Sequence, residues 1–306
     1  MKKIEHLLVA LDLTEMDDHL IRYSNFLVKK FQAKNISFIH VVKSYDIPKN
    51  ILADFPDMNI PLTDIIREWI KEKTDELYKE RKNTKMNINV AEGYTTENII
   101  RYSRENKIDL TLIGKKLGYQ GKGGVTRKIM SLTPSSILLV SETARPEINH
   151  LLVRMDFNKI SEMALKTALY VKEATGAKIS CFHVAKLPLK YFSRESVSNL
   201  ANLEEKMKNH NKKEFEKLLK RLKLSSKDIP FQSVLDTENQ EELYLYRQAL
   251  KTGADMIMLG SRIKSEMADI ILENTSEKLA ASEKNISVFI VKDRTSTTGF
   301  LEALFD

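Results

Sequence analysis

Short apolar segments of strand length alternate along this chain with longer segments that carry apolar residues at helical spacing. The short segments are rich in Val, Ile and Leu, which is typical of strands buried on both faces of a parallel sheet. Their alternation with helices predicts right-handed crossovers and an α/β fold. We expect strands near 5–11, 35–42, 86–91, 109–114 and 136–140, and again near 149–155, 178–185, 230–235, 255–259 and 287–291.

The pattern occurs twice, with four matched segments in the same order in each half of the chain. The matched pairs are HLLVALD (6–12) with HLLVRMD (150–156), FIHVV (38–42) with CFHVA (181–185), IDLTLIG (108–114) with GADMIMLG (253–260), and SILLV (136–140) with SVFIV (287–291). A repeat of such long period predicts two copies of one domain. We expect one domain over 1–142, a second over 147–293 and a C-terminal tail over 294–306.

Helix signals fit the gaps between the predicted strands. Thr14 followed by Asp17 predicts a capped N-terminus for the first helix. Gly176 predicts a left-handed end for the corresponding helix of the second half. Two long segments, 47–61 and 187–200, precede charged helices, and segments of this length often cover a binding cleft.

Charge, apolar runs and the single cysteine limit the classes of partner and the cellular compartment. The formal charge of +7 would suit a nucleic-acid partner, but most lysines alternate with glutamates on predicted helix faces, so we expect solvated faces and no nucleic acid. The longest apolar runs are far below the ~20 residues of a spanning helix, and the N-terminus does not resemble a secretory signal, so we expect a cytoplasmic protein without a membrane. Cys181 lies in an apolar run and is expected to be a buried, inert thiol.

Candidate chemistry lies at the carboxyl ends of the strands, where open parallel sheets bind ligands. Asp12 and Asp156 end the first strand of each half, and His40 and His183 lie near the end of the second. The two aspartates could also cap the helices that follow, and the histidines are expected to be satisfied core residues. Neither a nucleophile with its base nor a set of metal ligands stands out.

The fourth strand ends at Gly114 and is followed by a glycine-rich segment, KKLGYQGKGGVTRKIM. Its glycines allow close backbone approach, and a helix starting near Val125 would favour an anion at its N-terminus. The segment is not a P-loop, because Lys122 is followed by Gly123 and the segment follows the fourth strand.

This order of segments resembles the universal stress protein family over about residues 3–141 and 148–292, as in its tandem members. The resemblance implies a five-stranded parallel sheet in each half and, in one branch of the family, ATP as ligand, with Mg²⁺ entering only together with the nucleotide. The roles in adenine, ribose and phosphate binding would fall on Asp12, Val41, Gly114, Gly123, Gly124, Val125 and Thr126, and in the second half on Asp156, Val184, Gly260, Ser261, Arg262 and Thr275.

Both loops depart from the family pattern. In the first half Leu117 stands at the second glycine position, and the loop is shorter than in the family. In the second half Ile263 replaces that glycine, and the carboxylates of Glu266 and Asp269 would repel a triphosphate. Any nucleotide is therefore expected in the first half.

We expect a stress-response regulatory protein that binds rather than turns over its ligand. Its halves would pack as an internal pseudo-dimer with 136–140 pairing 287–291, and a homodimer could add to this. One alternative is a slow ATPase or self-phosphorylating protein using Thr126 or Thr275, and another is a nucleotide-free interaction scaffold using 47–61 or the tail. The sequence does not identify a protein partner.

Overall fold

The computed structural model describes residues 3–43, 61–79, 83–116, 124–187, 200–261, 275, 278–279 and 285–293. The chain divides into two compact units, with the boundary between Pro146 and Glu147. The predicted cleft-covering segments 47–61 and 187–200 and the tail 294–306 lie almost wholly outside the described residues.

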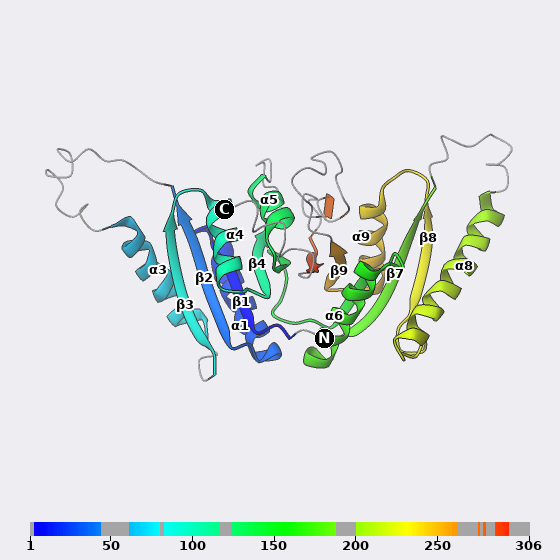
Figure 1. Ribbon diagram of the computed structural model, residues 1–306, viewed down its shortest axis with the longest axis horizontal. Coiled ribbons are helices and arrows are strands. Elements are labelled where there is room, and N and C mark those ends of the chain that lie inside the picture. Colours follow the sequence, from blue (N-terminus) through cyan, green and yellow to red (C-terminus); the bar gives the residue numbers. More distant parts are fainter. Residues whose placement is uncertain are drawn as a thin grey trace. The chain divides into compact units, whose positions relative to one another are not determined.

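The first domain is built on a parallel sheet of five strands, drawn in blue to green in Figure 1. The strand order is β3-β2-β1-β4-β5, with every neighbouring pair parallel. The strands are β1 (His6–Ala10), β2 (Asn35–Val42), β3 (Lys85–Glu92), β4 (Leu110–Lys115) and β5 (Ser136–Ser141). Each lies within about one residue of the predicted run. Strands β1, β2, β4 and β5 are apolar and mostly buried, which leaves little freedom in their placement, whereas the edge strand β3 is largely half-buried.

Four described helices flank this sheet: α1 (Met16–Phe31), α3 (Leu62–Leu77), α4 (Thr95–Glu105) and α5 (Gly124–Leu132). Helix α1 contacts α3, and α4 contacts α5. Right-handed crossovers place the first pair on one face of the sheet and the second pair on the other, because the chain leaves β1 in one direction and returns to β4 on its opposite side. The strand order therefore reverses between β1 and β4.

The second domain repeats this architecture. Its order is β10-β9-β6-β7-β8, again parallel throughout, and it reverses between β6 and β9. The strands are β6 (His150–Arg154), β7 (Lys178–Lys186), β8 (Phe231–Asp236), β9 (Met256–Ser261) and β10 (Ser287–Lys292), and the long helices are α6 (Lys159–Thr175), α8 (Leu200–Arg221) and α9 (Glu241–Thr252). The predicted α/β class and the tandem five-stranded sheets are confirmed.

Each domain also contains the same polar contact, at the amino end of its central strand. The Asp109 carboxylate accepts hydrogen bonds from the backbone N–H groups of Glu5 and His6, at 3.0 and 2.9 Å. Asp255 does the same for the N–H groups of Asn149 and His150, at 2.6 and 2.8 Å. The same carboxylate thus pins the start of the first strand in both halves, which supports the prediction of an internal repeat.

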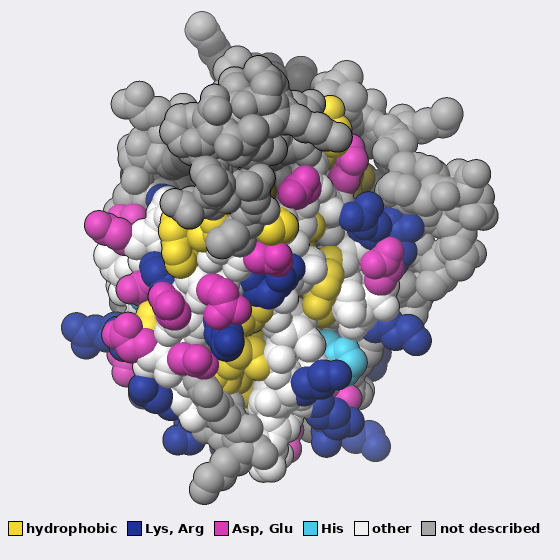
Figure 2. All heavy atoms as spheres, turned by 90° about the vertical axis from the view of Figure 1, so that its left-hand side faces the viewer, with side chains coloured by type: hydrophobic (Ala, Val, Ile, Leu, Met, Phe, Trp, Pro, Cys, Tyr) yellow, Lys and Arg dark blue, Asp and Glu magenta, His cyan; other side chains and the backbone are white. Residues whose placement is uncertain are grey.

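Surface charges of both signs are interspersed on the face that Figure 2 presents. On α3, Arg67 pairs with Asp64 and Lys71 pairs with Glu68, three residues apart in each case. This pattern fits the predicted solvated helix faces. None of the helices in the described part of the chain has the length and apolar composition needed to cross a bilayer.

Candidate functional site

In the first domain, an aspartate and a lysine meet where the strand order reverses. Asp12 follows β1 and Lys116 follows β4, and the Lys116 ammonium lies 2.6 Å from the Asp12 carboxylate. The hydroxyl of Thr14 donates to the same carboxylate at 2.6 Å, and Lys116 also donates to that hydroxyl at 2.7 Å. The Asp12 side chain is 57% exposed and Lys116 is 27% exposed, so the pair lies at the surface of the sheet's carboxyl edge.

A buried carboxylate holds the turn that carries Asp12. Asp17 is 1% exposed, and its two oxygens accept hydrogen bonds from the backbone N–H groups of Asp12 and Leu13 at 3.0 and 2.8 Å. Leu13 lies in the left-handed region with φ 60°, which is uncommon for a leucine and is stabilised here by these bonds. The predicted Thr14 cap is therefore wrong: α1 has no side-chain cap, and the Thr14 hydroxyl bonds to Asp12 instead.

The two carboxylates of this turn differ in their acidity. Burial alone would raise the pKa of Asp12, but the hydrogen bonds from Lys116 and Thr14 and the positive charge of Lys116 together lower it. Burial raises the pKa of Asp17 to about 6, and the nearby Asp12 charge adds to this, against the hydrogen bonds from the backbone. Asp12 is thus a fixed anion at neutral pH, while Asp17 titrates in a mildly acidic range.

Gly114 and Gly260 end the fourth strand of their domains and allow the first helix to pack closely. A Cβ added at Gly114 would lie 2.5 Å from Cγ of Met16, and one at Gly260 would lie 2.5 Å from both Cγ2 and the carbonyl oxygen of Ile160. The need for glycine here follows from helix packing on the strand. The family resemblance implies a role for both glycines in nucleotide binding, to which this packing adds a structural role.

The other predicted residues of the first half are only partly brought to the same edge. Val41 is 9% exposed and lies within β2. Gly124, Val125 and Thr126 form the first turn of α5, where Val125 is 49% exposed. Gly123 lies outside the described residues. Asp12 is therefore the predicted residue with the clearest polar environment in this domain.

The histidines of the second strands are hydrogen-bonded to the backbone, as predicted, but they are half-buried at the edge of the core. Nδ1 of His40 donates to the backbone carbonyl of Leu11 at 3.0 Å, and Nδ1 of His183 donates to that of Met155 at 2.6 Å. In both domains the histidine therefore ties the second strand to the residue just before the candidate aspartate. This contact positions the turn and leaves the histidine a structural role.

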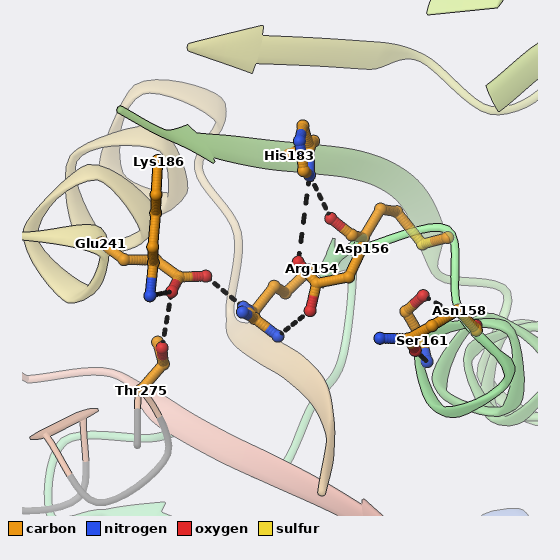
Figure 3. A network of polar contacts seen from close by, with 9 residues as sticks. Arg154, Asp156, Asn158, Ser161, His183, Lys186, Glu241 and Thr275 are labelled. Carbon is orange, nitrogen blue, oxygen red and sulfur yellow. Dashed lines mark hydrogen bonds and ion pairs between the residues drawn. The ribbon is translucent and has the colours of Figure 1, made fainter. Parts of the chain in front are cut away.

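In the second domain the corresponding aspartate is engaged by an arginine of its own strand. Arg154 pairs with Asp156 through one guanidinium nitrogen and with Glu241 through another (Figure 3). The Arg154 side chain is 17% exposed and Asp156 is 26% exposed, against 57% for Asp12. Neither Asp12 nor Asp156 caps a helix by these contacts, and Asn158 caps α6 by accepting from the N–H of Ser161 at 2.9 Å.

Glu241, the first residue of α9, is the centre of this network. It is 2% exposed, and its carboxylate also accepts from Lys186 at 2.8 Å and from the Thr275 hydroxyl at 2.7 Å. Burial alone would raise the pKa of Glu241, but the hydrogen bond and charge of Arg154 and the bonds from Lys186 and Thr275 outweigh it and lower the pKa to about 2. The carboxylate therefore stays ionised across the physiological range.

Of the remaining predicted residues of the second half, Thr275 contacts this network. Val184 is 3% exposed within β7, and Gly260 and Ser261 end β9. Thr275 was predicted as a phosphate contact, and its hydroxyl binds a carboxylate of the chain itself. Arg262 lies outside the described residues.

Four charged residues of the two sites were not found from the sequence: Lys116, Arg154, Lys186 and Glu241. The best available signal was Arg154, which interrupts the apolar run HLLVRMD where the first half has Ala10. A charge at a strand position buried on both sides requires a partner. Its partner Glu241 is 87 residues away along the chain, so only the fold identifies the pair.

A pocket and the grouping of possible metal ligands also bear on ligand binding. A shallow pocket of about 250 Å³ lies between α9 and the strands β7 and β8, and none of the predicted site residues lines it. Among the described residues, no three His, Cys, Asp or Glu side chains are grouped so that they could hold a metal ion.

The parallel sheets, their reversal points and the charged residues at their carboxyl edges define a tandem α/β protein of the kind that holds ligands at such edges. Residues 147–292 match the Universal stress protein family, and the first domain repeats the second in strand order and in its polar contacts. The second domain therefore belongs to the universal stress protein family, as the sequence resemblance implied, and the first domain repeats its architecture.

Two solved structures match the chain along its whole length. A universal stress protein from Archaeoglobus fulgidus covers 96% of this chain and 100% of its own, at 16% identity and a TM-score of 0.63. A putative universal stress protein from Pseudomonas aeruginosa covers 99% of this chain and 98% of its own, at 12% identity and a TM-score of 0.63. At these identities the likeness shows the fold alone.

A further universal stress protein from Archaeoglobus fulgidus, solved in complex with dAMP, covers 44% of this chain and 97% of its own, at 10% identity and a TM-score of 0.29. The comparison with curated proteins found no match.

Proposed function

We propose that this chain is a stress-response regulatory binding module that takes ATP or another adenine nucleotide at the carboxyl edge of β1 and β4 in its first domain. The proposal is carried by the Asp12–Lys116 pair, which sits where the strand order reverses. Asp12 is an ionised acceptor for the amino or hydroxyl donors of a nucleoside, and Lys116 is a donor for phosphate.

The pair is suited to exchange its partners. Both side chains are partly exposed, and exposed ion pairs contribute only ~0–1 kcal/mol. A nucleotide that supplies a phosphate to Lys116 and donors to Asp12 therefore displaces a weak contact. Binding would act by shifting the population of conformations that a partner recognises, without turnover of the nucleotide.

Calorimetric titration of ATP with Mg²⁺ into the full chain tests this function. We expect one ATP per chain, with affinity lowered about 10- to 100-fold in Asp12→Ala and Lys116→Ala, as for loss of a charged hydrogen bond. Lys34→Ala is the matched control, because it removes an exposed lysine paired with Glu5 at 3.0 Å and away from the site.

Two results would count against the proposal. One is wild-type protein that neither binds ATP nor carries adenine nucleotide when purified from cells and denatured, which would favour a nucleotide-free scaffold. The other is loss of binding in Asp156→Ala with wild-type affinity in Asp12→Ala, which would move the site to the second domain. Steady release of ADP in the same samples would instead indicate a slow ATPase.

A further inference from the structure

Three donors in the second domain converge on one carboxylate. Oε1 of Glu241 accepts from Nε of Arg154, while Oε2 accepts from the Lys186 ammonium at 2.8 Å and the Thr275 hydroxyl at 2.7 Å. Figure 3 shows the side chains of Arg154 on β6, Lys186 on β7 and Thr275 pointing toward the same carboxylate. A guanidinium, an ammonium and a hydroxyl that surround two oxygens form the donor set by which proteins hold carboxylates and phosphates.

The carboxylate at the centre comes from a different element than its donors. Glu241 is the first residue of α9, whereas α4, the corresponding helix of the first domain, begins at Thr95. The first domain also has Ala10 where the second has Arg154. Arg154 and Glu241 are therefore features of the second domain alone, whereas Lys186 has a counterpart in Lys43 of the first half.

We propose that Arg154, Lys186 and Thr275 form an oxyanion site in the second domain, and that Glu241 is its built-in occupant and closes it to carboxylates and phosphates from solution. This site is independent of nucleotide binding by the first domain. Thr275, which the sequence predicts as a phosphate contact, thus belongs to an anion site, but this site is filled by a carboxylate of the chain itself.

The tethered carboxylate has a large advantage over a free anion. Its local concentration is set by the short side chain and the folded helix, and a ligand from solution would have to exceed that effective concentration. Glu241 is also 2% exposed, so a competing anion would have to enter a site that is already desolvated. Removing the carboxylate reverses the balance, because three donors are then left around an empty space.

The decisive variant is Glu241→Ala, and the probes are sodium acetate and sodium phosphate at constant ionic strength adjusted with sodium chloride. The control is Glu242→Ala, which removes the neighbouring carboxylate of α9, 3.8 Å from Lys278, and leaves the three donors untouched. We expect acetate or phosphate at about 100 mM to raise the melting temperature of Glu241→Ala saturably by about 5 °C. Wild type and Glu242→Ala should not respond.

The two probes distinguish the kinds of anion the site accepts. A response to acetate alone indicates a space shaped for a carboxylate, and a response to both indicates a general oxyanion site. Equal responses in wild type and Glu241→Ala would overturn the proposal, since the site would then be open in the presence of Glu241. Absence of any response in folded Glu241→Ala would also overturn it.

The Glu241→Ala chain could fail to fold without an anion, and the test then becomes one of recovery. Acetate in the refolding buffer should restore the yield of folded protein, and chloride at the same ionic strength should not. Glu241→Gln, which keeps the shape of the side chain in place, should fold and show no response to either anion. Failure of both anions to restore Glu241→Ala would contradict the proposal.

Discussion

Replacing Arg154 with methionine should destabilise the second domain by about 2–3 kcal/mol, because it leaves Glu241 buried without its main partner. The pKa of Glu241 falls from 4.5 to about 2 in the folded chain. At about 1.4 kcal/mol per pKa unit, the ionised carboxylate is stabilised by a net of roughly 3 kcal/mol, after the partners have offset the cost of its burial. Lys186 and Thr275 remain in the variant, so the expected loss lies just below the ~3–5 kcal/mol typical of broken buried pairs.

Hydrogen exchange measured peptide by peptide is the suitable assay, since it reports on the second domain separately and does not assume two-state unfolding of the whole chain. Amides of β6, β9 and the first turns of α9 should exchange about 30- to 100-fold faster in Arg154→Met. Arg247→Met is the control: Arg247 is exposed on α9, and no hydrogen bond or ion pair joins it to other described residues. Wild-type exchange rates in Arg154→Met would refute the reasoning.

A double substitution separates the pair's net contribution from the cost of an orphaned charge. Arg154→Met with Glu241→Leu removes both charges, and buried pairs replaced by apolar residues are often neutral or stabilising. We expect most of the lost protection to return in the double variant. If the double variant were as unprotected as Arg154→Met alone, the cost would come from lost packing of the arginine rather than from the buried carboxylate.

Two other expectations follow from the same contacts. Because the folded pKa of Asp17 is raised from 3.8 to about 6, the native state binds more protons between these values, and its stability should fall by about 2 kcal/mol as pH rises from 4 to 6. Asp17→Asn should flatten this slope in urea denaturation followed by Trp69, the only tryptophan, and an unchanged slope would disprove it. Gly260→Ala should cost about 1–3 kcal/mol and more than Gly114→Ala, because the added Cβ meets the carbonyl of Ile160; equal melting temperatures for the two variants would disprove this.

The strands and the repeat could be predicted because their signal is local. Continuous apolar runs buried on both faces mark most of the strands, although not the outer strands β3 and β8, and a second copy of the same order predicts the domain organisation. Gly176 also ends α6 as predicted, with φ 84° and its N–H bonded to Lys172. These features depend on neighbours within a few residues, so a single sequence contains the necessary information.

The charged contacts could not be predicted in the same way, because each joins distant elements. Lys116 is one of two adjacent lysines after β4, and nothing in the sequence distinguishes it from a solvated surface lysine. Thr14 precedes Asp17 in a capping pattern, yet the carboxylate of Asp17 bonds backwards to the turn. Local capping rules failed here because a buried Asp17 carboxylate requires hydrogen-bond donors. The two backbone N–H groups of the left-handed turn supply them.

The two domains neutralise the same aspartate in different ways, and the difference decides what each edge can do. Asp12 takes a lysine from the neighbouring strand, and both side chains are exposed enough for the contact to be exchanged. Asp156 takes an arginine from its own strand, whose other nitrogen is committed to a buried carboxylate. A guanidinium fixed at two points loses more on leaving its partners than a flexible ammonium does. One edge therefore carries a partly exposed ion pair, and the other carries charges that are committed to one another.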